Sequence, residues 1–514
     1  MRDPRRCVHA VLTTLACLAV LVSSSALGQE KTPGFNQKIP EEIMTPEKVE
    51  TRLGTLNFVD GIPTVETAQK VYDNLDFLRG TEVFLNFIPA ASVEAVRRGH
   101  VGMGATKSHH ALIFDQLMDS SPLFLTGNTD TVYCSLMLDL ESDGPTVVEI
   151  PPGSGPGTVN DAFFRFVVDM GAVGPDRGQG GKYLIVPPGY KGELSKEGYF
   201  VAHSTSYSNW LLLRGFLVDG KPDAASKMFR EGGKVYPLAQ AASPPKMVFT
   251  NGSKVPFNTI HANNFEFYEE LDHVIQREPI DLFDPELRGL AAAIGIKKGQ
   301  KFAPDERMKK ILTEAVAVGN ATARAVAFRN RDSRATYFPN SHWTTLFVGG
   351  DYRWLDGDGM GGRNLNARTA YFYIATLNTP AMIMKTVGKG SQYAMVAADK
   401  TGADLDGAKT YRLNIPANVP AKDFWSLVIY DPQTRSELQT SQPFPSKNNK
   451  RDQLITNADG SVDLYLGPTA PPGKEANWIQ TVPKKNWFAL FRVYGPLEPW
   501  FDKTWKPGEI EEMK

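Results

Sequence analysis

Near the start of the chain, apolar residues recur every three or four positions, which is the spacing of one helix face. They are Val65, Ala68, Val71, Leu75 and Leu78. A second helical pattern covers residues 264–330 and includes a long, alanine-rich amphipathic stretch from 305 to 328. The residues before the first pattern, 29–60, are polar and dotted with proline. We therefore expect an extended leader, a helical N-terminal segment and a helical insert.

Short apolar or alternating runs, cut by Gly, Pro, Asn and Asp, fill the region 123–220 and resume after residue 334. In the first region the runs are 132–140, 146–150, 162–168, 183–186 and 210–218. A further strand is expected at 370–376. Strands of this length, with turn residues roughly every 8–12 positions, are typical of antiparallel sandwiches. Both regions are therefore predicted to be rich in β-structure.

Four landmarks occur in the same order in the two β regions. In the first region they are Ile150-Pro151, the pair Asp161 and Asp169, Pro187-Pro188-Gly189, and Asn209-Trp210 followed by Arg214. Their counterparts are Ile415-Pro416, the pair Asp423 and Asp431, Pro471-Pro472-Gly473, and Asn486-Trp487 followed by Arg492. This repeat predicts that 123–220 and 370–500 are diverged copies of one sandwich of jelly-roll type. Core packing, with each arginine paired to a carboxylate, is the simplest explanation of the last landmark.

The predicted fold is mainly β with α segments. It consists of two tandem jelly-roll-like antiparallel β-sandwiches, a helical N-terminal segment and a helical insert. The expected boundaries are 1–28 for a signal peptide, 29–122 for the leader and helical segment, 123–255 for the first sandwich, 256–335 for the insert and 336–514 for the second sandwich.

The N-terminus has the layout of a secretory signal peptide. Arginines precede the mostly apolar run 10–22, and Ala26-Leu27-Gly28 supplies small residues at the cleavage positions. We expect cleavage near Gly28 and export to the periplasm or the medium. The apolar run is shorter than the roughly 20 residues that cross a bilayer, and no later run reaches that length, so no membrane span is expected. Cys134 is the only cysteine after this site, which excludes a disulfide within the mature chain.

Charge and motifs exclude several classes of protein. The formal net charge of −1 argues against a general nucleic-acid-binding protein. The sequence has no His-Glu-x-x-His, Gly-x-Ser-x-Gly, Walker or paired Cys-x-x-Cys motif. The run 357–362 has the spacing Gly-x-Gly-x-x-Gly, but a strand rather than a helix is expected after it, so we interpret it as a loop. No metal site and no cofactor are predicted.

Three stretches carry a family resemblance. They are 128–133 (Asn-Thr-Asp-Thr-Val-Tyr) with Leu138-Asp139-Leu140 after it, 473–478 (Gly-Lys-Glu-Ala-Asn-Trp) and 491–496 (Phe-Arg-Val-Tyr-Gly-Pro). In these residues the chain resembles bacterial and viral proteins that pair domain of unknown function 1254 with domain of unknown function 1214. The likeness covers about residues 60–500. It implies two jelly-roll-like domains with helical decoration, and it implies little about chemistry.

The stretch 128–133 is the strongest candidate site. Asn128, Asp130 and Tyr133 are suited to a polar pocket that binds a sugar, and Asp130 is suited to act as the base that positions a water for hydrolysis. The alternative is an Asx-turn that starts a strand, with Tyr133 packed inside. The sequence leaves both interpretations open.

Two further candidates involve histidines. His261 lies in a polar cluster just before a helix and is the second catalytic candidate. His342, Trp343 and Arg353 combine an aromatic platform with a cation, which suits recognition of a sugar or a carboxylate. For each histidine the alternative is a structural or surface role.

Two functions fit these features. The first is an exported protein that binds, and as an enzyme hydrolyses, a small organic or carbohydrate-like ligand. The second is a non-catalytic binding or structural module built from tandem jelly rolls, because one fold serves many functions. The expected partner is a small molecule or a glycan. The sequence leaves enzymatic activity and assembly into a homo-oligomer open.

Overall fold

We describe the protein from a computed structural model, in which residues 39–194 and 197–514 are described. The predicted signal peptide, 1–28, lies outside these residues. The chain divides into two compact units, Met1–Val71 and Tyr72–Lys514. Both sandwiches and every site discussed below belong to the second unit.

The described part of the first unit contains a small antiparallel sheet where an extended leader was expected. A 3-10 turn at Glu41–Ile43 precedes strands β1 (Lys48–Thr51), β2 (Gly54–Val59) and β3 (Ile62–Pro63). Asp60 and Gly61 both have positive φ, as two-residue hairpin turns of this kind require. The expectation was wrong because this Asp-Gly pair turns the chain back on itself.

Nine helices occur in the described part of the chain. They are α1 (Val65–Gly102), α2 (Leu140–Asp143), α3 (Asp223–Gly232), α4 (Glu266–Arg277), α5 (Pro285–Ala293), α6 (Glu306–Phe328), α7 (Leu365–Ile374), α8 (Pro380–Ile383) and α9 (Glu498–Phe501). Helices α1 and α4 to α6 fall where helical patterns were predicted. Helix α6 begins at a capping residue, Asp305, whose side chain accepts the amide of Met308 at 2.7 Å.

Helix α7 replaces the strand expected at 370–376. Asn364 caps its start by accepting the amide of Ala367 at 2.9 Å. Most of its residues are buried, including Tyr371, Phe372 and Tyr373. A helix buried on nearly all sides has no polar face, so its apolar run carries no helical period and was wrongly interpreted as a strand.

The first sandwich consists of a six-stranded and a four-stranded sheet, with strand orders β13-β4-β5-β11-β7-β8 and β10-β9-β6-β12. The strands are β4 (His110–Ile113), β5 (Val132–Asp139), β6 (Thr146–Ile150), β7 (Gly157–Asp161), β8 (Phe166–Met170), β9 (Gly181–Val186), β10 (Phe200–His203), β11 (Ser208–Gly215), β12 (Lys234–Pro237) and β13 (Val248–Asn251). Apolar residues from both sheets, such as Leu136, Leu211 and Ile185, share one core.

The second sandwich consists of two four-stranded sheets, β14-β20-β16-β17 and β19-β18-β15-β21. Its strands are β14 (Ser391–Val396), β15 (Tyr411–Ile415), β16 (Ala421–Tyr430), β17 (Ser446–Asn448), β18 (Val462–Gly467), β19 (Trp478–Gln480), β20 (Phe488–Pro496) and β21 (Ile510–Glu512). Leu413, Leu427 and Phe491 belong to the core between its sheets.

The two sandwiches share one strand order. Taken along the chain, β5 to β12 of the first correspond one by one to β14 to β21 of the second. The order β5-β11-β7-β8 recurs as β14-β20-β16-β17, and β10-β9-β6-β12 recurs as β19-β18-β15-β21. Each corresponding pair also keeps its direction. Among the repeated landmarks, Ile150 and Ile415 end β6 and β15, while Arg214 and Arg492 lie on β11 and β20.

Two details of the prediction were wrong. The sandwiches are not wholly antiparallel, because β10 runs parallel to β9, β19 to β18 and β13 to β4. A parallel neighbour needs a long connection that returns the chain to the same end, such as 187–199 before β10. The two aspartate pairs of the second landmark also lie in different structural elements. The stretch between Asp161 and Asp169 crosses the turn from β7 to β8, whereas that between Asp423 and Asp431 follows the single strand β16.

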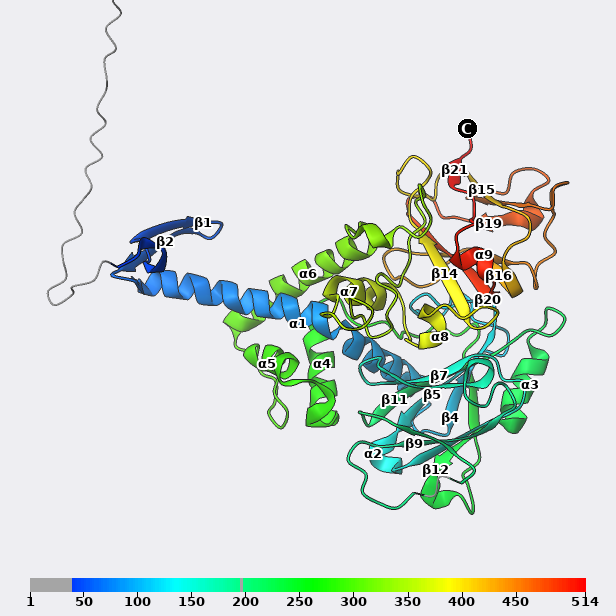
Figure 1. Ribbon diagram of the computed structural model, residues 1–514, viewed down its shortest axis with the longest axis horizontal. Helices are drawn as coiled ribbons and strands as arrows, with labels where there is room; N and C mark the ends of the chain where they lie inside the picture. The colour runs from blue at the N-terminus through cyan, green and yellow to red at the C-terminus, as the bar shows by residue number, and fades with distance from the viewer. Residues whose placement is uncertain (1–38, 195–196) are drawn as a thin grey trace, which may run out of the picture. The chain divides into compact units, whose positions relative to one another are not determined.

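A third, central core joins the sandwiches to the helices. Because successive side chains of a strand point to opposite faces, Leu211 of β11 packs inside the first sandwich while Leu212 packs in the central core. In the same way, Phe491 of β20 packs inside the second sandwich while Leu490 packs in the central core. Helices α6 and α7 lie side by side against it (Figure 1). Each sandwich therefore contributes the outer face of one sheet to a shared interior.

Candidate functional site

A small cavity, here called the inner cavity, lies between these facing sheets. Its lining includes Tyr133, Leu212 and Arg214 from the first sandwich, Tyr393, Leu490 and Arg492 from the second, and Tyr371 from α7. Its volume is about 30 Å³, which exceeds the roughly 10–15 Å³ that one water requires. Polar groups from both sandwiches thus surround a space that can hold a few atoms.

Arg214 and Arg492 occupy equivalent places in the two sandwiches. Arg214 lies opposite Tyr133 of the neighbouring strand β5, and Arg492 lies opposite Tyr393 of β14. Only 8% of Arg214 and 3% of Arg492 is exposed. Neither takes part in any ion pair within residues 39–194 and 197–514. Two positive charges are therefore buried in the cavity wall with no carboxylate at ion-pair distance.

Aromatic rings and main-chain oxygens are the neighbours of these guanidinium groups. Arg214 lies 5.5 Å from the centroid of the Tyr133 ring. Arg492 donates to the carbonyl oxygen of Thr126 at 2.7 Å and to the hydroxyl of Tyr430. The Nε atom of each arginine has no hydrogen-bond partner. Because a guanidinium only donates, these atoms remain available to an acceptor such as an anion.

Asn128 holds Tyr133 at the edge of the cavity. Its Nδ2 donates to the Tyr133 hydroxyl at 2.5 Å, and its Oδ1 accepts the amides of Asp130 and Thr131 at 2.9 and 3.2 Å. This is the geometry of an Asx-turn at the start of a strand. Burial raises the pKa of Tyr133, so its hydroxyl stays protonated. Since the oxygen already accepts from Asn128, the hydroxyl hydrogen is left to donate.

Asp130 is fully buried and connects the two sandwiches. Its carboxylate accepts from Ser426 Oγ at 2.5 Å, Asn448 Nδ2 at 3.0 Å and the Tyr494 hydroxyl at 3.1 Å. All three donors belong to the second sandwich. The carboxylate therefore fixes the position of the 128–133 stretch, and of Tyr133 with it, against the sheet that carries Arg492.

Asp169 of β8 is a second buried carboxyl group near Arg214. Thr379 donates to its Oδ2 at 2.9 Å, while its Oδ1 has no partner. Burial raises the pKa of Asp169 to about 6, although the Thr379 hydrogen bond and the charge of Arg214 act in the opposite direction. The folded protein thus favours the protonated form of this group more than the unfolded chain does.

We expect Asp169→Asn to stabilise the protein by about 1–3 kcal/mol at pH 8 and to change its stability little at pH 4. The folded-state pKa of Asp169 is raised from 3.8 to about 6. Protonated Asp169 therefore stabilises the fold relative to its ionised form. This stabilisation is complete below the unfolded-state pKa of 3.8 and is lost as the pH rises through about 6. Urea unfolding at the two pH values measures the difference. Exposed Asp404→Asn is the control, and an equal effect of Asp169→Asn at both pH values would contradict the prediction.

Two family models match the chain. One, described as Protein of unknown function (DUF1254), matches residues 110–237, and the other, described as Protein of unknown function (DUF1214), matches residues 390–498. The chain pairs DUF1254 with DUF1214. The resemblance inferred from the sequence is confirmed.

Two solved structures are similar to this chain. The VPA0106 protein from Vibrio parahaemolyticus is 18% identical, with a TM-score of 0.53 over 86% of this chain and 100% of that chain. An uncharacterised protein from Burkholderia cenocepacia is 13% identical, with a TM-score of 0.38 over 87% of this chain and 97% of that chain. No curated protein sequence matches the chain. At this identity, the first likeness supports the fold alone.

The inner cavity lies between the two named domains. Arg214 and Asp130 fall in the DUF1254 match, and Arg492, Ser426 and Tyr494 fall in the DUF1214 match. Each domain therefore supplies one buried arginine to the cavity and one side of the Asp130 contact. The cavity requires both domains.

His261 lies outside the inner cavity. Its ring is buried against Phe84, Phe267 and Tyr373. Burial and then the charge of Arg435 lower its pKa to about 3, so the ring is neutral at ordinary pH. Its Nδ1 bonds to the carbonyl of the next residue at 2.9 Å, and its Nε2 has no partner. The structure does not bring it to Asp130, and its predicted catalytic role stays a prediction.

The other predicted ligand-binding residues are dispersed. His342 is half-exposed and pairs with Glu509 at 3.2 Å. Trp343 is fully buried in the DUF1214 core and donates from Nε1 to the carbonyl oxygen of Gly508 at 2.9 Å. Arg353 lines a separate pocket. The sequence placed these three in one cluster because they are close along the chain, but the loop between them takes Arg353 elsewhere.

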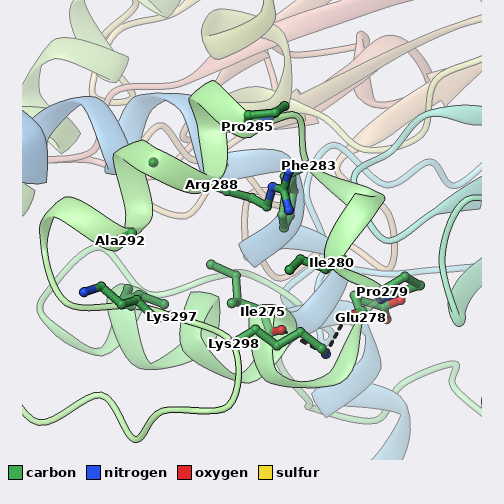
Figure 2. A pocket seen from close by; sticks show the side chains of 12 residues that line it. Ile275, Glu278, Pro279, Ile280, Phe283, Pro285, Arg288, Ala292, Lys297 and Lys298 are labelled. Atoms are coloured by element: carbon green, nitrogen blue, oxygen red, sulfur yellow. Dashed lines mark hydrogen bonds between the residues drawn. The ribbon is translucent and has the colours of Figure 1, made fainter.

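A wider groove lies along α4 and α5, with a volume of about 360 Å³ (Figure 2). Its walls are mostly apolar, and Figure 2 shows Ile275, Ile280 and Phe283 among the labelled side chains. The amine of Lys298 donates a hydrogen bond to the carbonyl oxygen of Glu278 at 2.6 Å, just after the end of α4. This lysine is therefore engaged within the fold.

The sequence signal for the two arginines was present but was interpreted differently. Arg214 and Arg492 close the last repeated landmark, and each was expected to pair with a carboxylate. That expectation was wrong, because no ion pair in the described residues includes them. A repeated arginine on equivalent strands is the feature that marks this site.

Two further features are absent from residues 39–194 and 197–514. No helix there is both long enough and apolar enough to cross a membrane. No three histidine, cysteine, aspartate or glutamate side chains there are grouped so that they could hold a metal ion.

Proposed function

We propose that the chain binds a small organic anion in the inner cavity, between its DUF1254 and DUF1214 domains. The observation that carries the proposal is the pair of buried arginines, Arg214 and Arg492, which lack a carboxylate partner. An unpaired buried charge costs several kcal/mol. A ligand that brings a negative charge between the two guanidinium groups offsets that cost, and this favours an anion over a neutral ligand.

A carboxylate is the anion that fits these groups best. Guanidinium groups present parallel N–H donors that match the two oxygens of a carboxylate. The free hydrogen of the Tyr133 hydroxyl supplies a further, uncharged donor. The cavity of about 30 Å³ has room for an acid group rather than for a whole sugar. A carbohydrate-like ligand in this site would therefore be a sugar acid that places only its carboxylate between the arginines.

Binding without turnover is the function we favour. Asp130, the predicted base, is fully buried and accepts hydrogen bonds from Ser426, Asn448 and Tyr494. These bonds suit a residue that joins domains, since a general base must reach the proton it removes. Hydrolysis of the ligand with Asp130 and His261 as catalytic residues stays a prediction.

We propose that the two jelly-roll-like domains act as one ligand-binding unit after export to the periplasm or the medium. The arginines and the apolar run within residues 1–28 support export.

The test is a thermal-melting titration of the protein with acetate, malonate and pyruvate, at ionic strength held constant with chloride. A ligand at 100 times its Kd adds about 2.7 kcal/mol of stability, so we expect a saturable rise in Tm of several degrees for at least one acid. Acetamide, malonamide and pyruvamide are the neutral controls and are expected to give no shift. The absence of a saturable shift with every acid would contradict the proposal, as would an equal shift with the matching amide.

A further inference from the structure

A second pocket, here called the outer pocket, lies where the turn between β7 and β8 meets residues 352–372. Its volume is about 310 Å³, within the roughly 300–1,000 Å³ range of small-molecule sites. One wall carries Phe163 and Arg165, and the other carries Trp354 and Arg368. It shares no lining residue with the inner cavity. The two are therefore separate cavities.

The outer pocket has an excess of positive charge. Four arginines line it: Arg165, Arg353, Arg363 and Arg368. The neighbouring carboxylates are already engaged. Asp351 pairs with Arg353 at 2.9 Å, Asp161 lies 3.9 Å from Arg165, and Asp284 caps α5 by accepting the amide of Leu287 at 2.9 Å. The described residues thus provide fewer carboxylates than arginines here, and the remaining charge favours an anionic ligand.

Arg368 is the least satisfied of the four. Only 4% of it is exposed, and its guanidinium donates to Asn86 Oδ1 at 2.7 Å. Its Nε has no hydrogen-bond partner. Burial, together with Arg363 and Arg165, lowers the pKa of Arg368 to about 10. At neutral pH the group is therefore still charged, and a neighbouring anion would be favourable.

Aromatic rings complete the walls. The Phe163 ring lies 5.2 Å from the Arg165 guanidinium and 5.7 Å from that of Arg368. Phe164 and Phe372 stack with their centroids 5.1 Å apart and their planes 5° from parallel. Rings beside cations suit a ligand that is flat and apolar at one end and negatively charged at the other.

We propose that the outer pocket binds an aromatic carboxylate, with its carboxylate on Arg368 and its ring against Phe163 and Phe372. A bidentate pair with Arg368 would use the Nε that now lacks a partner. Trp354 lines the same pocket and its indole N–H is also buried without a partner. Its fluorescence therefore offers a direct report of occupancy.

Titration of the full chain with benzoate, followed by tryptophan fluorescence and by calorimetry, tests this proposal. We expect saturable binding, at least 100-fold weaker binding of benzamide, which has no charge, and at least 10-fold weaker binding of acetate, which has no ring. Arg368→Gln is expected to weaken benzoate binding at least 100-fold. Because Arg368 is buried, the exposed Arg363→Gln is a second variant, and we expect it to weaken binding at least threefold while the fold is retained.

Two controls separate this pocket from the rest of the molecule. Arg412→Gln removes an exposed arginine paired with Glu511 and is expected to bind benzoate normally. Arg492→Met, which alters the inner cavity, is also expected to bind benzoate normally, so that failure of one site does not count against the other. Unchanged benzoate binding in folded Arg368→Gln and Arg363→Gln would overturn the proposal. In the Arg492→Met variant, whose inner cavity is altered, binding of benzamide or acetate as tight as that of benzoate would also overturn it.

Discussion

Replacing Asp130 with alanine is expected to lower the free energy of unfolding by about 3–5 kcal/mol. The substitution leaves the buried donors of Ser426, Asn448 and Tyr494 without their shared acceptor. Each unsatisfied buried donor costs about 1–3 kcal/mol, and these costs overlap because a water can enter part of the space. Urea unfolding monitored by circular dichroism measures the loss.

The matched control removes an aspartate that makes a surface ion pair. Asp404 is exposed and pairs with Arg329, so Asp404→Ala is expected to cost less than about 1 kcal/mol. Asp130→Asn keeps the shape of the side chain and one acceptor oxygen, and it is expected to fall between the two. A loss for Asp130→Ala no larger than that for Asp404→Ala would show that Asp130 does not hold the domains together.

Arg214→Met and Arg492→Met are each expected to weaken binding of a small carboxylate by about 30-fold to several thousand-fold, which corresponds to 2–5 kcal/mol for one partner of a buried charge pair. Both guanidinium groups face the inner cavity, so either loss removes half of the positive charge. Calorimetric titration of the acid with the largest shift in Tm measures the effect. Arg412→Met, on the surface of the DUF1214 domain, is the control.

The stability of the unliganded variants distinguishes a binding role from a structural one. Arg214 makes no ion pair within the described residues, so removing its charge relieves a desolvation cost. We therefore expect unliganded Arg214→Met to be as stable as the natural protein or more stable. Strong destabilisation of this variant without ligand would indicate that Arg214 serves the fold and would contradict its assignment to the binding site.

The repeated topology offers an explanation for the presence of two domains in one chain. Arg214 and Arg492 lie on corresponding strands, and Tyr133 and Tyr393 lie opposite them on corresponding neighbours. A single sandwich would present one arginine on an open sheet face. Two facing copies enclose both charges in a low-dielectric space, where their attraction for an anion is stronger than at the surface.

Much of the fold could be predicted from local pattern. Proline and glycine stops after β6 and β9 recur after β15 and β18, because a proline cannot donate to a sheet ladder. The pattern failed where tertiary burial decides the structure. The aromatic residues of α7 are buried on nearly all sides and show no helical period, and parallel pairs such as β9 with β10 depend on connections whose paths a sequence does not specify.

The candidate site was predictable only in part. The stretch from Asn128 to Tyr133 was recognised because an Asn and an Asp two positions apart precede a hydroxyl and a phenol at alternating strand positions. The roles of Arg214 and Arg492 could not be recognised in this way, since a buried arginine that lacks a carboxylate looks the same in sequence as one that has it. Arg492, for example, donates to the carbonyl oxygen of Thr126, which lies 366 residues away along the chain.

The most direct test of the central claim is a crystal structure of the protein grown with the carboxylate that gives the largest shift in Tm. The account predicts a carboxylate in the inner cavity, with its oxygens within hydrogen-bonding distance of both Arg214 Nε and Arg492 Nε. An inner cavity that holds only water, in crystals where the acid occupies another part of the molecule, would contradict it.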